Sequence, residues 1–220
     1  MGSRRAAHVV DLMTEVGQFR EWADSYPPGP RSGEWKCDYG AWIDLYDAVL
    51  NYVAVSAPEA WPDEALQAIL YALARDNESE HLAEEICLRH PATLVALGRA
   101  ALARGEPDAK WQLAEQLGHH AHDGDEAERL LLILARDESE YVRRRALGAL
   151  VRVGSPAVER LALDAWHRPD KHQEWARMMA LDCLQRIGSP HLDRLLAEAE
   201  RHERQHLRDF AKRIRQNRAD

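Results

Sequence analysis

Apolar residues recur every three or four positions along most of the chain, and Pro, Gly or Asp breaks this pattern at short intervals. Such spacing is typical of amphipathic helices, whereas strands find almost no support. Pro and acidic residues favour the first turn of a helix, and Gly favours its end. The pattern predicts helices near residues 6–25, 38–56, 62–75, 78–89, 91–104, 107–119, 125–137, 139–153, 156–167, 171–187, 190–202 and 204–217.

Two of these predicted helices belong to an internal repeat. The apolar spacing, the Gly that ends a helix and the Ser-Pro that begins the next indicate one helical hairpin stacked on another. The sequence therefore predicts an all-α superhelix, with about five helical hairpins after residue 60 and with Ala146 and Ala180 tightly buried where helices meet. The first copy is Val142-Arg143-x-x-Ala146-x-x-x-Leu150-x-x-Val153-Gly154-Ser155-Pro156, and the second, 34 residues later, is Ala176-Arg177-x-x-Ala180-x-x-x-Leu184-x-x-Ile187-Gly188-Ser189-Pro190.

Weaker copies of this second-helix pattern start at Leu82, Ala109 and Leu207. The Val-Arg-x-x-Ala, Leu and Ile-Gly-x-Pro features, with Leu-Ala-Arg-Asp at 73–76 and 134–137, resemble the HEAT repeat family. The resemblance is good over residues 124–190, fair over 62–123 and 190–217, and absent over 1–56. It implies an α-solenoid. HEAT proteins serve as scaffolds, as inhibitors, as immunity proteins against toxins and, in one branch, as DNA glycosylases.

The region before the repeats is richer in large aromatic residues. Four rings recur at spacings that place them on one face of a helix, and a face of this kind needs cover. A terminal repeat lacks a neighbour on one side, so residues 1–60 are expected to form an N-terminal helical cap with a Pro/Gly-rich loop at 26–33, and residues 61–220 to form the repeats. The four rings are Trp35, Tyr39, Trp42 and Tyr46, with Trp22 before and Tyr52 after them.

A partner surface is expected on the outward face of the second helices. Aromatic, Met and Arg residues are enriched where interfaces carry binding energy. The alternative is that Trp111 and Trp175 pack between repeats. The outward positions are His81, Glu84 and Glu85; Asp108, Trp111 and Gln112; Tyr141, Arg144 and Arg145; Trp175, Met178 and Met179; and His206, Asp209 and Phe210, and Glu115 and Asp182 complete the predicted surface.

A basic residue also recurs on these helices, at Lys110, Arg143, Arg177 and Arg208. We expect this ladder to be structural, with each stem lying along the stack and each charge paired with an acid in a neighbouring turn.

Charge is distributed unevenly within a formal net charge of −8. Residues 1–60, 61–140 and 141–220 carry net charges of −4, −10 and +6. The acidic majority disfavours nucleic acid and favours a basic protein partner, although charge that only keeps the stack soluble is an equal alternative. Because no apolar run is long enough to cross a bilayer, we expect a cytoplasmic protein.

Motifs for catalysis or cofactor binding are absent from the sequence, including phosphate-binding glycine loops, Gly-x-Ser-x-Gly and His-Glu-x-x-His. His119-His120-x-His122-Asp123-x-Asp125 resembles a metal cluster but falls in a predicted loop without a further ligand, so we expect no metal and no cofactor. The odd, distant cysteines Cys37, Cys87 and Cys183 are expected to be reduced.

These observations favour a non-enzymatic binding protein, of the bacterial immunity or inhibitor kind that neutralises a toxin or another basic protein. The alternative is a HEAT-like DNA glycosylase or nucleic-acid binder, suggested by Trp166, Trp175 and Arg177, by Asp182 as an acid and by the basic C-terminal third. The acidic segment 61–140 would repel a duplex lying along the groove, which disfavours this alternative. Identity of the partner and oligomeric state are not encoded in any recognisable motif.

Overall fold

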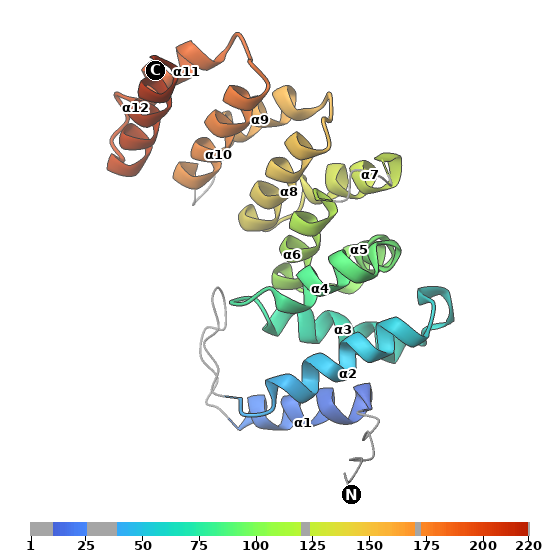
Figure 1. The fold of residues 1–220 in the computed structure, drawn as a ribbon. Helices are drawn as coiled ribbons and strands as arrows, with labels where there is room; N and C mark the ends of the chain where they lie inside the picture. The colour runs from blue at the N-terminus through green and yellow to red at the C-terminus, as the bar shows by residue number, and fades with distance from the viewer. Residues whose placement is uncertain (1–10, 26–38, 120–123, 170–172, 220) are drawn as a thin grey trace, which may run out of the picture. The chain divides into compact units, whose positions relative to one another are not determined.

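The protein is all-helical over the residues that its computed structural model describes, which are 11–25, 39–119, 124–169 and 173–219 (Figure 1). Each predicted helix is present. The helices are α1 (Leu12–Asp24), α2 (Trp42–Val55), the short 3-10 helix η1 (Pro58–Ala60), α3 (Asp63–Arg75), α4 (His81–Arg89), α5 (Pro91–Arg104), α6 (Pro107–Leu117), α7 (Gly124–Leu134), α8 (Glu140–Arg152), α9 (Val158–His167), α10 (Gln173–Arg186), α11 (Leu192–Ala199) and α12 (Gln205–Ala219).

Helices α2 and α9 begin later than predicted, because the residues just before them form turns. Helix α2 begins at Trp42 and not near residue 38, so Tyr39 precedes the helix. Helix α9 begins at Val158, because the main chain of Ser155 accepts a hydrogen bond from the Val158 amide in a turn before the helix. The Pro/Gly-rich loop, Trp35 and Cys37 lie outside the described residues.

Packing divides the chain into two compact units, Met1–Leu113 and Ala114–Asp220, so the division falls within α6. In the first unit α1 packs on α2 and α3, α2 packs on α4, and α5 packs on α3 and α4. Its core includes the fully buried Phe19, Leu45, Ile69 and Leu82. The division between cap and repeats at residue 60 stays a prediction.

Aromatic rings of the first unit gather around Phe19. The Phe19 ring lies 4.8 Å from Tyr39, 5.1 Å from Trp42 and 5.6 Å from Trp22 between centroids. Trp42 in turn lies 5.3 Å from Tyr46, one helical turn later. The rings therefore cover one another through Phe19 of α1, which was not among the residues of the predicted aromatic face.

The second unit contains the helical hairpins α7–α8, α9–α10 and α11–α12. The second helices form a row, in which α10 contacts both α8 and α12 (Figure 1). Ala146 and Ala180 are fully buried in this row, as predicted. Cys183, on α10, and Cys87, on α4, are free and buried, which confirms the expectation for these two cysteines.

The two copies of the repeat end their second helices in the same way. Gly154 and Gly188 have φ of 69° and 66°, in the left-handed region that favours glycine. The next residue then donates its amide back to the helix, from Ser155 to the Leu150 carbonyl at 3.0 Å and from Ser189 to the Leu184 carbonyl at 2.9 Å. This is the hydrogen bonding of a Schellman motif, so the predicted role of both glycines as helix stops is confirmed.

The same serines close the open end of the hairpins α7–α8 and α9–α10, which is the end opposite to the loop between the two helices. Ser155, after α8, donates its hydroxyl to Glu128 of α7 at 2.5 Å, and Ser189, after α10, donates to Glu159 of α9 at 2.6 Å. In the last hairpin an ion pair takes this place: Arg218 of α12 lies 2.5 Å from Asp193 of α11. Each contact joins the end of the second helix to the first helix of the same hairpin.

Two of the recurring arginines, Arg143 and Arg208, stabilise the closed end of a hairpin, where a loop joins its two helices. Arg143 donates to the carbonyls of Asp137 and Glu138 at 2.8 and 2.7 Å, and Arg208 donates to those of His202 and Glu203 at 2.6 and 2.8 Å. These carbonyls lie in the loop between the two helices of the same hairpin. Arg143 and Arg208 thus have the structural role expected of the ladder, and their hydrogen bonds satisfy backbone oxygens that would otherwise lack a partner.

Candidate partner-binding surface

An exposed row of rings and one guanidinium runs across the second helices of the second unit. Arg144 lies 4.6 Å above the Tyr141 ring and 5.9 Å from the Trp175 ring, measured from its guanidinium carbon to each centroid. Trp175 stacks on His206 at 6.3 Å. We call Tyr141, Arg144, Trp175 and His206 the aromatic strip. Its members come from α8, α10 and α12, so three successive hairpins build one surface.

Packing and an ion pair hold the aromatic strip in place. Arg144 forms an ion pair with Glu140 at 3.0 Å, which fixes its guanidinium between the two rings. Tyr141 and Trp175 nevertheless remain 37% and 45% exposed. Large rings with this exposure offer contact area of the kind that binding anchors provide.

Several other predicted site residues of the second unit have partners within the protein. Arg145 lies 5.6 Å from the Tyr141 ring, beside the aromatic strip. Asp182 pairs with Arg186 at 3.1 Å, and Met178 is half-buried. Glu115 is held by Arg152 at 2.7 Å and by Arg145 and His119 at 3.6 Å each. The Glu115 carboxylate is thus already paired within the protein.

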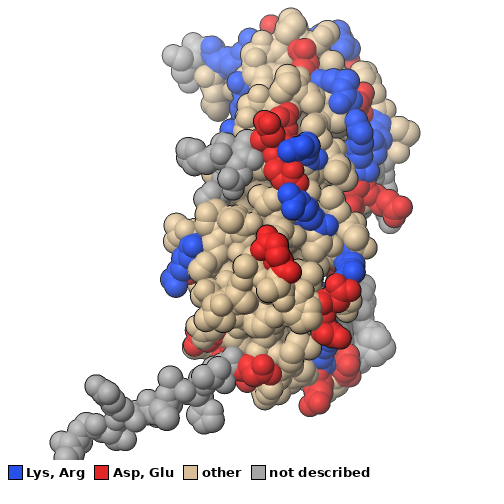
Figure 2. Space-filling view, turned by 90° about the vertical axis from the view of Figure 1, so that its right-hand side faces the viewer, with Lys and Arg blue, Asp and Glu red and all other residues tan. Residues whose placement is uncertain are grey.

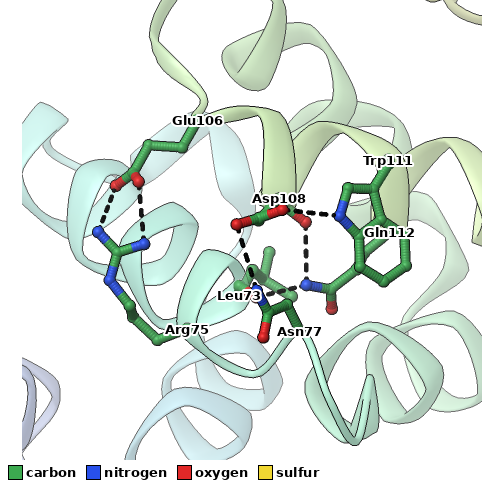
Figure 3. A network of polar contacts seen from close by, with 7 residues as sticks. All are labelled: Leu73, Arg75, Asn77, Glu106, Asp108, Trp111 and Gln112. Carbon is green, nitrogen blue, oxygen red and sulfur yellow. Dashed lines mark hydrogen bonds and ion pairs between the residues drawn. The ribbon is translucent and has the colours of Figure 1, made fainter. Parts of the chain in front are cut away.

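The predicted outward position of Trp111 and Gln112 is wrong. Trp111 is 4% exposed and donates from its indole nitrogen to Asp108 at 3.0 Å (Figure 3). Gln112 is fully buried and donates to the carbonyls of Leu73 and Asp108 at 2.6 and 2.9 Å. Trp111 is therefore packed inside the protein, which was the alternative interpretation, whereas Trp175 is exposed.

Figure 3 shows what these side chains do instead: they join the end of α3 to the start of α6. Asn77, just after α3, donates to the Asp108 carboxylate at 3.2 Å, and Arg75 forms a two-pronged ion pair with Glu106 at 2.9 Å for each bond. This network lies within the first unit. Its polar atoms are used for packing and are not offered to a partner.

The remaining predicted residues of the first unit lie on α4. The His81 ring packs 4.7 Å from Tyr46, and Glu85 pairs with Arg89 at 2.7 Å. Glu84 is exposed. Of the three, Glu84 has the position that a charged partner surface requires.

The sequence interpretation missed a pocket between the hairpins α7–α8 and α9–α10. Its volume is about 290 Å³, and we call it the arginine pocket. The only sequence signal for it is the Arg at the end of the first helix, at Arg136. Its lining is Arg136, Arg143, Arg144, Arg160 and Arg168 with Glu140 and Asp164, over Ala135, Leu147, Leu161, Ala165, Ala176 and Met179.

The charged side chains on the surface are distributed unevenly, as the net charges of the sequence segments predict. On the face drawn in Figure 2 most Lys and Arg side chains lie over the C-terminal helices, and Asp and Glu predominate over the N-terminal helices. The aromatic strip lies within residues 141–220, the segment with a net charge of +6, and so does most of the arginine pocket.

Residues that suggested a DNA glycosylase have structural contacts. Trp166 is buried and donates to Glu198 at 3.2 Å. Arg177 donates to the Trp166 carbonyl at 3.0 Å and lies 2.7 Å from His202. Asp182, the candidate acid, is paired with Arg186 as described above.

The predicted histidine loop cannot be placed as a whole, because His120, His122 and Asp123 lie outside the described residues. Over the described ranges there is no group of three or more His, Cys, Asp or Glu side chains that could hold a metal ion. Within the same ranges no helix is long and apolar enough to span a membrane.

Stacked helical hairpins with a row of second helices define an α-solenoid class of protein. Comparison with sequence families agrees: the family described as HEAT repeats matches residues 127–210, which include both strong copies of the repeat. Residues 127–210 are therefore similar to HEAT repeats, as the resemblance implied. No curated protein and no solved structure gives a significant match to the chain.

Proposed function

We propose that the protein is a binding module whose second unit holds a protein partner across the aromatic strip. HEAT repeats commonly mediate contacts between proteins, which supports a partner of this class. The single observation that carries the proposal is the exposure of Tyr141 and Trp175 on either side of Arg144. Aromatic residues and Arg are the types that most often dominate binding energy.

The test uses affinity capture with the full chain from cells that naturally contain it, followed by binding measurements with the captured protein. We expect Trp175→Ala to weaken the complex by about 2 kcal/mol, or roughly thirtyfold in Kd, and Tyr141→Ala to weaken it in the same direction. Arg144→Ala should also weaken it, because it removes the group that holds the two rings in position.

A matched control is Ile133→Ala on α7, which removes an exposed apolar side chain from a first helix outside the aromatic strip. The control should bind like the unchanged chain. Thermal unfolding of all four variants verifies that the second unit remains folded. A partner whose affinity is unchanged by the three strip substitutions binds another surface, and the proposal is then wrong.

A narrower hypothesis is an immunity- or inhibitor-type protein that neutralises a toxin or another basic protein. The formal net charge of −8 and the exposed Glu84 support it. Reversing the charges of Glu84 and Glu85 should then slow association and reduce its salt dependence, with little change in dissociation. A toxin gene beside the gene for this chain would give independent support, and a partner whose association does not depend on Glu84 and Glu85 would contradict the hypothesis.

We further propose that the protein acts by binding and not by catalysis. The support is that Trp166, Arg177 and Asp182, the groups that a glycosylase mechanism would need, already have packing or ion-pair partners. The purified chain should release no base from alkylated DNA. Base release that is lost in Asp182→Asn would favour the glycosylase alternative.

A further inference from the structure

The arginine pocket carries more positive than negative charge, and part of that charge has no counterpart. Its lining includes five arginines against Glu140 and Asp164. Glu140 pairs with Arg144 at 3.0 Å, and Asp164 pairs with Arg160 at 3.3 Å. The net charge of the lining is therefore positive after both internal ion pairs are counted.

The three other arginines differ in how their donors are used. Arg143 donates hydrogen bonds to the carbonyls of Asp137 and Glu138. Arg136 and Arg168 are exposed, and neither forms an ion pair with a carboxylate of the described residues. These two guanidinium groups retain the paired donors that match a carboxylate.

Beneath this charge the pocket is apolar. Leu147 and Leu161 are buried, Met179 is half-buried, and the small side chains of Ala135 and Ala165 leave the space open. A volume of about 290 Å³ is at the lower limit of ligand pockets and suits one or two apolar side chains. Filling it with an apolar group would remove the lining from water and stabilise a complex.

We propose that the arginine pocket binds an acidic peptide segment of a partner protein. An apolar side chain of the segment enters the pocket over Leu147, Leu161 and Met179, and carboxylates on either side of it pair with Arg136 and Arg168. The two arginines follow successive first helices, α7 and α9, so they can meet successive carboxylates along an extended chain. Arg144 belongs both to the aromatic strip and to the lining of the pocket, but the peptide contacts proposed here do not use it. The inference therefore goes beyond the aromatic strip and stands even if the strip binds nothing.

Nucleic acid fits the same pocket less well. The apolar lining offers nothing to a phosphate or a sugar, and the carboxylates of Glu140 and Asp164 would oppose a closely spaced row of phosphates. An acidic peptide can instead place its charges at the edge and its apolar side chain in the centre.

The test measures fluorescence anisotropy with a labelled short peptide that has Leu at its centre and Glu on both sides in a Gly-Ser background. Two matched peptides replace either the Glu residues by Gln or the central Leu by Ala. We expect the full chain to bind the first peptide and each matched peptide to bind about tenfold more weakly, since each loses one of the two kinds of contact. A single-stranded DNA oligonucleotide serves as the competing class of ligand.

Variants of the chain locate the binding. The double variant Arg136→Gln with Arg168→Gln should lose at least about tenfold in affinity. The control Arg201→Gln with Lys212→Gln removes the same number of charges from exposed positions outside the pocket and should bind normally. Ala165→Leu should block the pocket without changing its charge.

Three outcomes overturn the proposal: no binding of the Leu-Glu peptide at millimolar concentration, equal binding of the Gln peptide, or preference for the oligonucleotide. An unchanged unfolding midpoint in each variant shows that lost affinity does not reflect lost structure. Because the probe is a peptide and not the captured partner, failure here leaves the test of the aromatic strip unaffected.

Discussion

Ser189 and Glu159, 30 residues apart in the chain, share a hydrogen bond of 2.6 Å that joins the end of α10 to the beginning of α9. Ser155 and Glu128 repeat the contact one hairpin earlier. Ser189 is buried, and a hydrogen bond from a buried hydroxyl to a carboxylate contributes more than one between neutral groups. This pair therefore contributes to the closure of the open end of the hairpin.

Ser189→Ala should lower the free energy of unfolding of the second unit by about 1 to 2 kcal/mol. Glu159→Ala should have a similar effect, and the double variant should cost less than the sum of the two single variants because both remove the same bond. Urea unfolding followed by circular dichroism measures all three. Strictly additive effects would show that the two side chains do not stabilise each other.

Trp111→Ala and Trp175→Ala should differ sharply in stability. Trp111 is buried, so its truncation leaves a cavity and removes the bond to Asp108, at a cost of about 3 kcal/mol or more. Trp175 is exposed, and its truncation should cost less than about 1 kcal/mol. Chemical unfolding of the two variants gives the comparison. Equal costs would mean that Trp175 is also a packing residue and would weaken the proposal for the aromatic strip.

Ala146→Leu should overpack the contact between neighbouring second helices. Ala146 is fully buried, and extra methylene groups in such a site force neighbouring side chains and backbone apart, at a cost of about 1 to 3 kcal/mol. The melting midpoint should fall accordingly. Leu substituted for the exposed Ala103 on α5 is the matched control and should leave the midpoint unchanged.

Asp76 should make stability depend on pH in the direction opposite to that of an ordinary surface carboxylate. Burial raises the pKa of Asp76, although the amide of Leu82 and the hydroxyls of Ser79 and Tyr46 donate to its carboxylate and oppose the rise. A folded-state pKa above the unfolded value means that the folded protein binds the proton more tightly. The contribution of Asp76 to the free energy of unfolding is then greatest at low pH and falls as pH rises.

The measurement compares the unchanged chain with Asp76→Asn by urea unfolding at a series of pH values. The difference in unfolding free energy, unchanged chain minus variant, should fall as pH rises from about 4 through the raised pKa, and should be level above it. Other titrating groups cancel in this difference. A difference that increases with pH would mean that the hydrogen bonds outweigh burial and lower the pKa.

Much of the fold could be predicted because its causes are local. Ala146, Ala180 and the glycines at 154 and 188 mark the same positions in two copies of one repeat, and helix periodicity with helix stops needs no knowledge of distant contacts. Tyr141 was expected to be exposed on the same basis, because it precedes the first apolar residue of its second-helix pattern, whereas for Trp175 the sequence left packing between repeats as an open alternative.

The positions two and three residues further along were less predictable. A long side chain on a helix leans toward the N-terminus, so Arg144 lies over Tyr141, and Trp111 at the corresponding position of α6 reaches back to Asp108. Whether such a side chain is then covered depends on neighbouring helices, which the periodicity of one helix does not include. The arginine pocket was unpredictable for a related reason, because its lining forms only when one hairpin packs against the next.

The contacts that close each hairpin affect how a chain of stacked hairpins can gain or lose repeats. Glu159 and Ser189 belong to one hairpin, as do Arg208 and the carbonyls that it binds. Duplication or loss of a whole hairpin would therefore leave the closure of every other hairpin intact. Asp193 stands 34 residues after Glu159 and pairs with Arg218, so an ion pair can close a hairpin in the place of a hydrogen bond from serine.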